Sequence, residues 1–306
     1  MALTDSRAGT LPALRLAGTF TALVTPFHPD GSLDLDSLAK LCEWQIASGI
    51  DGLVPCGSTG EAATLSHEEH VRVVRHVVEV ANKRVPVVAG AGSNSTREAI
   101  ELTGAARSAG ADAALLISPY YNKPTQEGIF QHYRAVAHET RLPIVIYNIP
   151  GRTASRIEPE TSARLSRVTG IAGLKESGGD LIATSETIAQ SAPSFAVLSG
   201  DDALTLPMLA IGARGAISTV ANIAPAAAAE LTRAHAAGNP ARARQLHYEL
   251  LPVTQALFTE SNPIPVKTAL AILGRIPSPT LRLPLTEISK ANRDRLEAAL
   301  ADLPRA

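Results

Sequence analysis

One lysine of this 306-residue chain stands where a buried strand would end. Lys175 follows the apolar run at residues 171–174 and precedes the polar, glycine-rich run at residues 176–179. An amine shielded from water holds its proton less tightly, and a neutral amine can attack a carbonyl to form a Schiff base. A single lysine after a single strand is more often an ordinary surface residue, so a catalytic role for Lys175 needs support from other residues of the chain.

Polar side chains also follow four other apolar runs, at residues 56–61, 118–122, 147–153 and 199–202. The hydroxyls and backbone N–H groups around Ser58 and Thr59 could hold a carboxylate. Tyr147 places a phenol at the same level, and Arg152 offers a guanidinium fork to a substrate carboxylate.

Each of these residues also has a purely structural interpretation. Residues 57–60 could form a plain turn, because glycine and serine favour turns. Tyr147 could be a core tyrosine, and Arg152 could pair with a nearby acid. Five polar strand ends around one buried amine nevertheless favour a catalytic site, since the carboxyl ends of parallel strands meet at one face.

A pair of aspartates and a pair of histidines are candidate ligands for a metal ion. Asp201 and Asp202 could bind one, but no histidine follows a neighbouring strand, so we expect no metal ion. His67 and His70 are spaced i, i+3, whereas the zinc-protease helix spaces its histidines i, i+4. We interpret them as a solvated helix face.

Eight short apolar runs alternate with longer amphipathic stretches. Each run is nearly continuous in Val, Ile, Leu and Ala, as expected for parallel strands buried on both faces. The runs cover residues 20–24, 52–55, 85–89, 113–117, 143–147, 171–175, 196–199 and 215–218. This pattern predicts an α/β fold, a (β/α)8 TIM barrel. A doubly wound sheet is the alternative, but it more often carries a glycine-rich nucleotide loop, and none follows the first run.

The pattern also predicts how the chain is divided. We expect an N-terminal extension at residues 1–14, the barrel at residues 15–236 and a C-terminal helical region at residues 237–306. In that region, helices are predicted over residues 241–256, 266–273 and 285–303. Two capping boxes, Ser66 with Glu69 and Ser95 with Glu98, predict helix starts within the barrel.

Composition narrows the class of protein. The net charge is −1, with 45% hydrophobic and 19% charged residues, and no basic face or long charge run is present. These values argue against nucleic acid or a membrane surface as the main partner. Cys42 and Cys56 are too few for a disulfide framework and fit a reducing compartment. No apolar leader precedes the barrel, so we expect a cytoplasmic protein.

Five short motifs occur in an order that resembles the pyruvate-dependent Schiff-base aldolase family. The resemblance runs from about residue 17 to the C-terminus and rests on residues 57–61 (GSTGE), 120–124 (YYNKP), 147–150 (YNIP), 173–176 (GLKE) and 199–202 (SGDD). As a set, these motifs are highly specific for that family.

The resemblance implies a role for each residue around pyruvate. Lys175 would form the imine with the ketone, and Ser58 and Thr59 would hold the carboxylate. Tyr147 would act as general acid and base. Thr59 would relay protons between Tyr147 and Tyr121, the latter contributed by a second subunit across a dimer interface. The partners would therefore be pyruvate and further copies of the chain, as a tetramer built from tight dimers.

The resemblance also implies how a second substrate is bound. Arg152 would orient the carboxylate of L-aspartate 4-semialdehyde, in lysine and diaminopimelate synthesis, while backbone groups at Gly200 and Ile217 line the pocket. The imine is itself an electron sink, so no cofactor is expected. The alternative keeps the imine chemistry with another aldehyde, as in sialic acid lyases and keto-deoxy sugar-acid aldolases or dehydratases.

Two departures from the pattern bear on the substrate and on regulation. Ser58 stands where members that use aspartate semialdehyde have threonine, and Ala154 stands where glycine is frequent. Bacterial members are often inhibited by L-lysine at the dimer interface, but Ala62 replaces a serine of that site. The residues matching the lysine site are His67, His70, Asn94, Glu98 and Tyr120.

Overall fold

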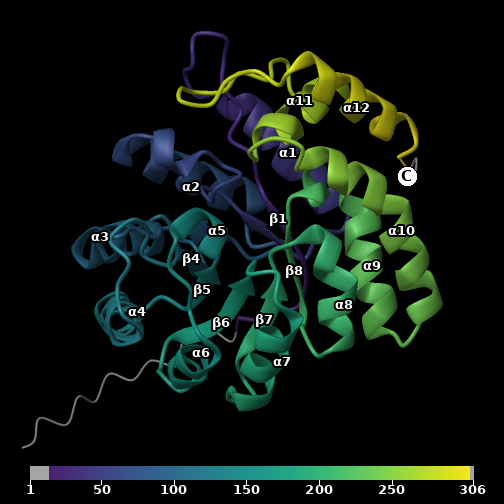
Figure 1. The fold of residues 1–306 in the computed structure, drawn as a ribbon. Helices are drawn as coiled ribbons and strands as arrows, with labels where there is room; N and C mark the ends of the chain where they lie inside the picture. Colours follow the sequence, from purple (N-terminus) through teal and green to yellow (C-terminus); the bar gives the residue numbers. More distant parts are fainter. Residues whose placement is uncertain (1–13, 304–306) are drawn as a thin grey trace, which may run out of the picture.

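Eight parallel strands form a barrel in the computed structural model, which describes residues 14–303 (Figure 1). The strands pair in the order β2-β1-β8-β7-β6-β5-β4-β3, and a bridge between Leu53 and Val87 joins the two ends of the sheet. The predicted TIM barrel is confirmed. The strands are β1 (Gly18–Ala22), β2 (Gly52–Val54), β3 (Val88–Gly90), β4 (Ala113–Ile117), β5 (Ile144–Asn148), β6 (Ile171–Glu176), β7 (Ala196–Ser199) and β8 (Gly215–Ser218).

The predicted runs match β4, β7 and β8 at both ends, whereas β3 begins three residues later than predicted. Pro86 has no N–H to donate to a neighbouring strand. The N–H of Val87 is bound by the side chain of Asp112 at 2.9 Å, so it too is unavailable to the sheet. Residues 85 and 86 are therefore not part of the strand, and Val87 joins the sheet through its isolated bridge to Leu53.

Helices surround the barrel and separate its strands in sequence (Figure 1). The predicted capping box of α2 is confirmed, since the Ser66 side chain accepts from the Glu69 N–H and the Glu69 side chain accepts from the Ser66 N–H. At α3 only the serine half forms, because the Glu98 carboxylate binds other groups. The helices are α1 (Leu35–Ala47), α2 (His67–Ala81), α3 (Thr96–Ser108), α4 (Gln126–Thr140), α5 (Pro150–Thr153), α6 (Pro159–Leu165), α7 (Leu181–Gln190), α8 (Thr205–Ala210) and α9 (Pro225–Ala236).

Three further helices follow the barrel: α10 (Pro240–Leu257), α11 (Ile264–Ile272) and α12 (Lys290–Ala301). The prediction that the last helix starts at residue 285 is wrong, because Ser289 caps α12 at its N-terminus. Helix α10 packs on α9, and buried residues of α10, α11 and α12 share one hydrophobic cluster with the barrel. The C-terminal helices and the barrel thus have a common core. Residues 1–13 of the expected extension lie outside the described residues.

A second, smaller apolar cluster fills the inside of the barrel. Phe20, Val54, Val145 and Leu198 belong to it, and Tyr147 closes it toward the carboxyl ends of the strands. This packed interior is the floor on which any site in the strand-end loops must rest. Within residues 14–303, no helix is long and apolar enough to cross a membrane.

Candidate active site

Lys175 and Tyr147 lie beside each other on neighbouring strands. They are paired in the register of β5 and β6, and the lysine Nζ lies 4.4 Å from the centroid of the tyrosine ring. Only 6% of Lys175 and 5% of Tyr147 is exposed. The structure thus buries the predicted nucleophile against the predicted proton donor.

The next register pair holds these two strands together. The Asn148 amide donates to both oxygens of Glu176, at 2.9 and 3.1 Å. Burial raises the pKa of the Glu176 carboxyl. Because this contact directly follows Tyr147 and Lys175 in each strand, it fixes the separation of the two reactive side chains.

Gly200, just after β7, gives the lysine its space. A Cβ at this position would lie 2.7 Å from Cε and 2.9 Å from Cγ of Lys175, and 2.0 Å from Oγ of Ser177. The backbone of Gly200 has an ordinary conformation, so the close approach alone requires glycine there. Ile217 in β8 is 1% exposed and belongs to the inner cluster.

The loop after β2 carries the two predicted hydroxyls at different depths. Thr59 is 4% exposed, and its Oγ1 accepts from the Asn262 amide at 2.8 Å. Ser58 is half-buried and lines a cavity together with Tyr147 and Arg152. The two neighbouring hydroxyls therefore have different surroundings.

A buried ion pair anchors the same loop. The Lys267 ammonium binds the Glu61 carboxylate at 2.7 Å, and both side chains are fully buried. The ammonium also donates to the Thr280 carbonyl and lies over the Phe27 ring. Burial, partly offset by Glu61, lowers the pKa of Lys267 to about 8. These contacts fix the end of the GSTGE motif to the C-terminal helices.

Arg152 lies in the short helix α5, at the edge of the cavity. Its Nη2 donates to the main-chain oxygen of Asn262 at 2.9 Å. Among residues 14–303 no ion pair joins Arg152 to an acid, so the structural interpretation of this residue gains no support. Ala154, which replaces the frequent glycine, caps α5 with a φ of +53°.

Tyr121 is placed apart from the other predicted residues. It is 88% exposed, with a φ of +71°, and within the described chain its hydroxyl makes no hydrogen bond to Thr59. Its own subunit thus does not complete the predicted relay.

Four of the five residues of the predicted lysine site line the same cavity, whose volume is about 480 Å³. His67 binds Glu98 at 3.0 Å, and Glu98 also accepts from Ser93. Burial lowers the pKa of His70. Its imidazole is 6% exposed overall, so the expectation of a solvated face is wrong for this histidine. His67, His70, Glu98 and Tyr120 line the cavity, and Asn94 donates to the Tyr120 carbonyl at 3.1 Å.

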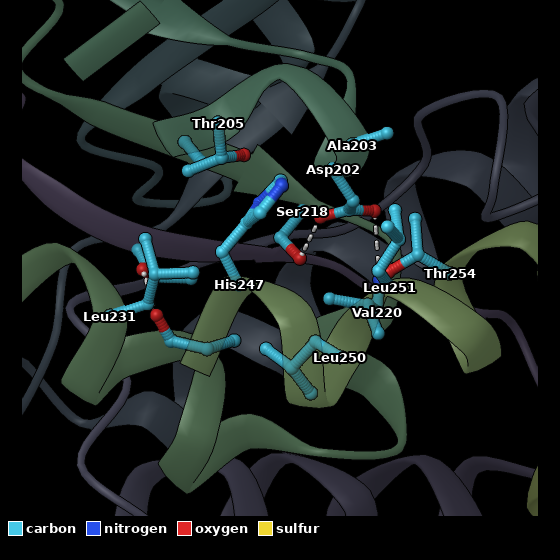
Figure 2. A pocket seen from close by; sticks show the side chains of 13 residues that line it. Asp202, Ala203, Thr205, Ser218, Val220, Leu231, His247, Leu250, Leu251 and Thr254 are labelled. Atoms are coloured by element: carbon cyan, nitrogen blue, oxygen red, sulfur yellow. Dashed lines mark hydrogen bonds between the residues drawn. The ribbon is translucent and has the colours of Figure 1, made fainter. Parts of the chain in front are cut away.

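Asp202 binds residues at the end of β8 and directly after it (Figure 2). Its carboxylate accepts from the Ser218 hydroxyl at 2.5 Å and from the N–H groups of Thr219 and Val220. Burial raises its pKa. It lines a small cavity against α10, beside His247, that contains none of the predicted catalytic residues. Within the described residues, no group of three potential metal ligands gathers.

Comparison with known proteins identifies the family to which the chain belongs. The model of the dihydrodipicolinate synthetase family matches residues 15–303. The chain belongs to that family. The resemblance to Schiff-base aldolases is thereby confirmed, and the chain is a Schiff-base-forming lyase of this family.

Individual relatives of the family agree. A 4-hydroxy-tetrahydrodipicolinate synthase of Nitratidesulfovibrio vulgaris (strain DP4) is 53% identical over 289 residues, covering 94% of this chain and 98% of that protein. The structure of the corresponding synthase from Methylacidiphilum fumariolicum SolV superposes with a TM-score of 0.92 at 46% identity, covering 94% of this chain and 96% of that one. A chloride-inhibited dihydrodipicolinate synthase from Acinetobacter baumannii, complexed with pyruvate, gives the same TM-score and identity over 94% and 99% of the two chains.

Sequence reasoning missed two contacts of the site. It did not foresee that Asn262 binds Thr59 or that Lys267 binds Glu61. One signal was available: helix α11 is apolar except for Lys267 and Thr268, and a lysine in the middle of such a helix needs a buried partner.

Proposed function

We propose that this chain condenses pyruvate with L-aspartate 4-semialdehyde through a Schiff base on Lys175. The observation that carries the proposal is the buried amine of Lys175 against the Tyr147 ring, at the carboxyl end of the barrel. The printed names of the relatives supply the reaction, and Arg152 supplies a cation at the cavity for a substrate carboxylate.

The proposed reaction passes through an imine and an enamine on Lys175. The Lys175 amine adds to the ketone carbon of pyruvate, and water leaves as the imine forms. Loss of a methyl proton to Tyr147 gives the enamine, whose carbon bonds to the aldehyde carbon of the second substrate, while the aldehyde oxygen takes up a proton and becomes a hydroxyl. The amine of that substrate then attacks the imine carbon, which closes a ring and releases Lys175. Tyr147 donates the proton that the departing water requires.

In this proposal Ser58, rather than Thr59, passes protons away from Tyr147. Ser58 lines the cavity with Tyr147, whereas Thr59 is buried and bound by Asn262. Thr59 then contributes its hydroxyl to the pyruvate carboxylate. Exposed Tyr121 reaches the site of a second copy in a dimer, within a tetramer, so full activity requires association.

Two further parts of the proposal concern regulation and location. L-Lysine binds where His67, Glu98 and Tyr120 line the cavity, and it slows the reaction. Two buried free cysteines, Cys42 and Cys56, fit a cytoplasmic enzyme. Calorimetric titration with L-lysine tests whether lysine binds, and no heat of binding at millimolar lysine would refute this part of the proposal.

Borohydride reduction in the presence of pyruvate, followed by intact-mass measurement, tests the central step. We expect a pyruvate-sized adduct that Lys175→Met abolishes and Lys123→Met retains. A protein that remains unmodified under these conditions is no Schiff-base enzyme.

The second substrate is tested through Arg152→Ala. Losing a charge-assisted contact to a carboxylate should lower kcat/KM for aspartate semialdehyde about 10- to 100-fold, while pyruvate trapping changes less than about threefold. Neutral sugar aldehydes are the comparison, because they do not need the guanidinium. Equal loss in trapping and condensation would remove Arg152 from its assigned task, and faster turnover of a sugar aldehyde would favour the alternative lyases.

A further inference from the structure

Asn262 connects two parts of the site that are far apart in sequence. Its side-chain Nδ2 donates to Oγ1 of Thr59 at 2.8 Å, and its main-chain oxygen accepts from Nη2 of Arg152 at 2.9 Å. Asn262 is 8% exposed and lines the cavity that Ser58 and Tyr147 also line. One residue of the C-terminal region thus contacts a residue of the β2 loop and a residue of α5.

The contact to Thr59 determines what that hydroxyl can do. A hydroxyl has one proton to give and accepts through its oxygen. Because Oγ1 of Thr59 already accepts from the Asn262 amide, its proton remains available for another acceptor. In the hydrogen bonds of residues 14–303 that proton has no acceptor. A carboxylate, which only accepts, is the complement of such a group.

The position of Asn262 is itself fixed. Helix α11 begins two residues later, and its Lys267 binds Glu61 at 2.7 Å inside the protein. Glu61 lies two residues beyond Thr59, so the same two segments are joined twice within a few residues. The amide is therefore held against Thr59 by a rigid element and has little freedom to turn away.

We propose that Asn262 is a positioning residue for pyruvate, which holds Thr59 as a hydrogen-bond donor to the substrate carboxylate. The proposal rests on the function proposed above and names the residue that orients its first substrate. Arg152 depends only on the main-chain oxygen of Asn262, so exchanging the side chain perturbs the pyruvate step and leaves the aldehyde step intact.

Two substitutions separate this proposal from a merely structural role. Asn262→Ala removes the donor and should raise the pyruvate concentration for half-maximal borohydride trapping about five- to tenfold. Asn262→Asp keeps the shape but presents acceptors, which capture the Thr59 proton and place a negative charge near the substrate carboxylate. It should weaken pyruvate binding at least about tenfold more than Asn262→Ala.

The experiment measures trapping rates against pyruvate concentration, and KM for each substrate, in Asn262→Ala, Asn262→Asp, Thr59→Val and the Asn262→Ala/Thr59→Val double variant. We expect KM for the aldehyde to stay within about twofold, and the double variant to lose no more than Thr59→Val alone, since both remove one interaction.

Three results overturn the inference while the proposed function stands: normal saturation by pyruvate in Asn262→Ala, additive losses in the double variant, or an aspartate variant that binds pyruvate better than the alanine variant. Thermal unfolding of each variant shows whether it folds, and the near-isosteric aspartate variant provides the comparison if alanine destabilises the chain. An unsubstituted protein that forms no pyruvate adduct refutes the proposed function, and the inference with it.

Discussion

Replacing Gly200 by alanine should disable Lys175 without unfolding the protein. The added Cβ would lie 2.7 Å from Cε and 2.9 Å from Cγ of Lys175. Carbon atoms pack at about 3.5–4.0 Å, so the lysine stem must move by about 1 Å. A displacement of that size at a reacting group costs about 100-fold in rate, whereas overpacking of a core costs about 1–3 kcal/mol in stability.

The assay is the rate of pyruvate trapping by borohydride, with the free energy of unfolding measured on the same preparations. We expect about a 100-fold slower trapping rate in Gly200→Ala and a folded protein. Gly104→Ala is the matched control, because a Cβ in the middle of α3 would meet nothing within 4 Å. It should trap at the unsubstituted rate and gain about 0.5–1 kcal/mol in stability.

The nearest atom to the new methyl group is Oγ of Ser177, at 2.0 Å, so that hydroxyl must be separated from the lysine. In a Gly200→Ala/Ser177→Ala double variant the hydroxyl clash is gone and the contacts to Lys175 remain. Trapping should stay slow. A Gly200→Ala protein that traps pyruvate at the unsubstituted rate would show that the position of Lys175 is not what Gly200 protects.

Two further predictions concern the ion pairs that join the C-terminal region to the barrel. Lys267→Met leaves the buried Glu61 carboxylate without its cationic partner and should lower the free energy of unfolding by about 3–5 kcal/mol, measured with denaturant. The Lys267→Met/Glu61→Gln double variant should recover part of that stability. An equal loss of stability in both variants would mean that the unpaired charge is not the cause. The Arg282 guanidinium holds the pKa of Glu69 at about 2, below its ordinary 4.5, so the carboxylate contributes stability that is present above about pH 4.5 and lost as the pH falls toward 2. The stability difference between the unsubstituted protein and Glu69→Gln should therefore shrink over that interval, and a difference that stays constant would contradict the assignment.

The barrel could be predicted from sequence because its signal is local. Each buried parallel strand is a continuous apolar run, and eight such runs separated by amphipathic stretches fit few other folds. The errors fell where a single residue alters the local hydrogen bonding. Pro86 and the Asp112–Val87 contact delay β3, and Ser289 sets the start of α12.

The residues of the candidate site also differ in how far the sequence could predict their positions. Lys175, Tyr147 and Ser58 stand at strand ends, so the rule that parallel strands end at one face was enough to bring them together. Tyr121 was expected to act in the site of a second subunit, and in its own subunit its backbone has a φ of +71° and its side chain is exposed. A strand pattern carries no information on a residue that another copy would contribute.

Asn262 shows what local patterns cannot supply. It lies 203 residues from Thr59 in sequence, and their contact depends on the path of α10 and α11 over the barrel. Strand-end rules find the groups that face the substrate, because each strand–helix unit places its own loop. Asn262, which sets the hydrogen-bonding direction of Thr59 in the proposal above, comes from outside the repeating units. In this chain the site is thus completed by a region that contributes no strand, and substitutions there should alter substrate binding as directly as substitutions in the barrel loops.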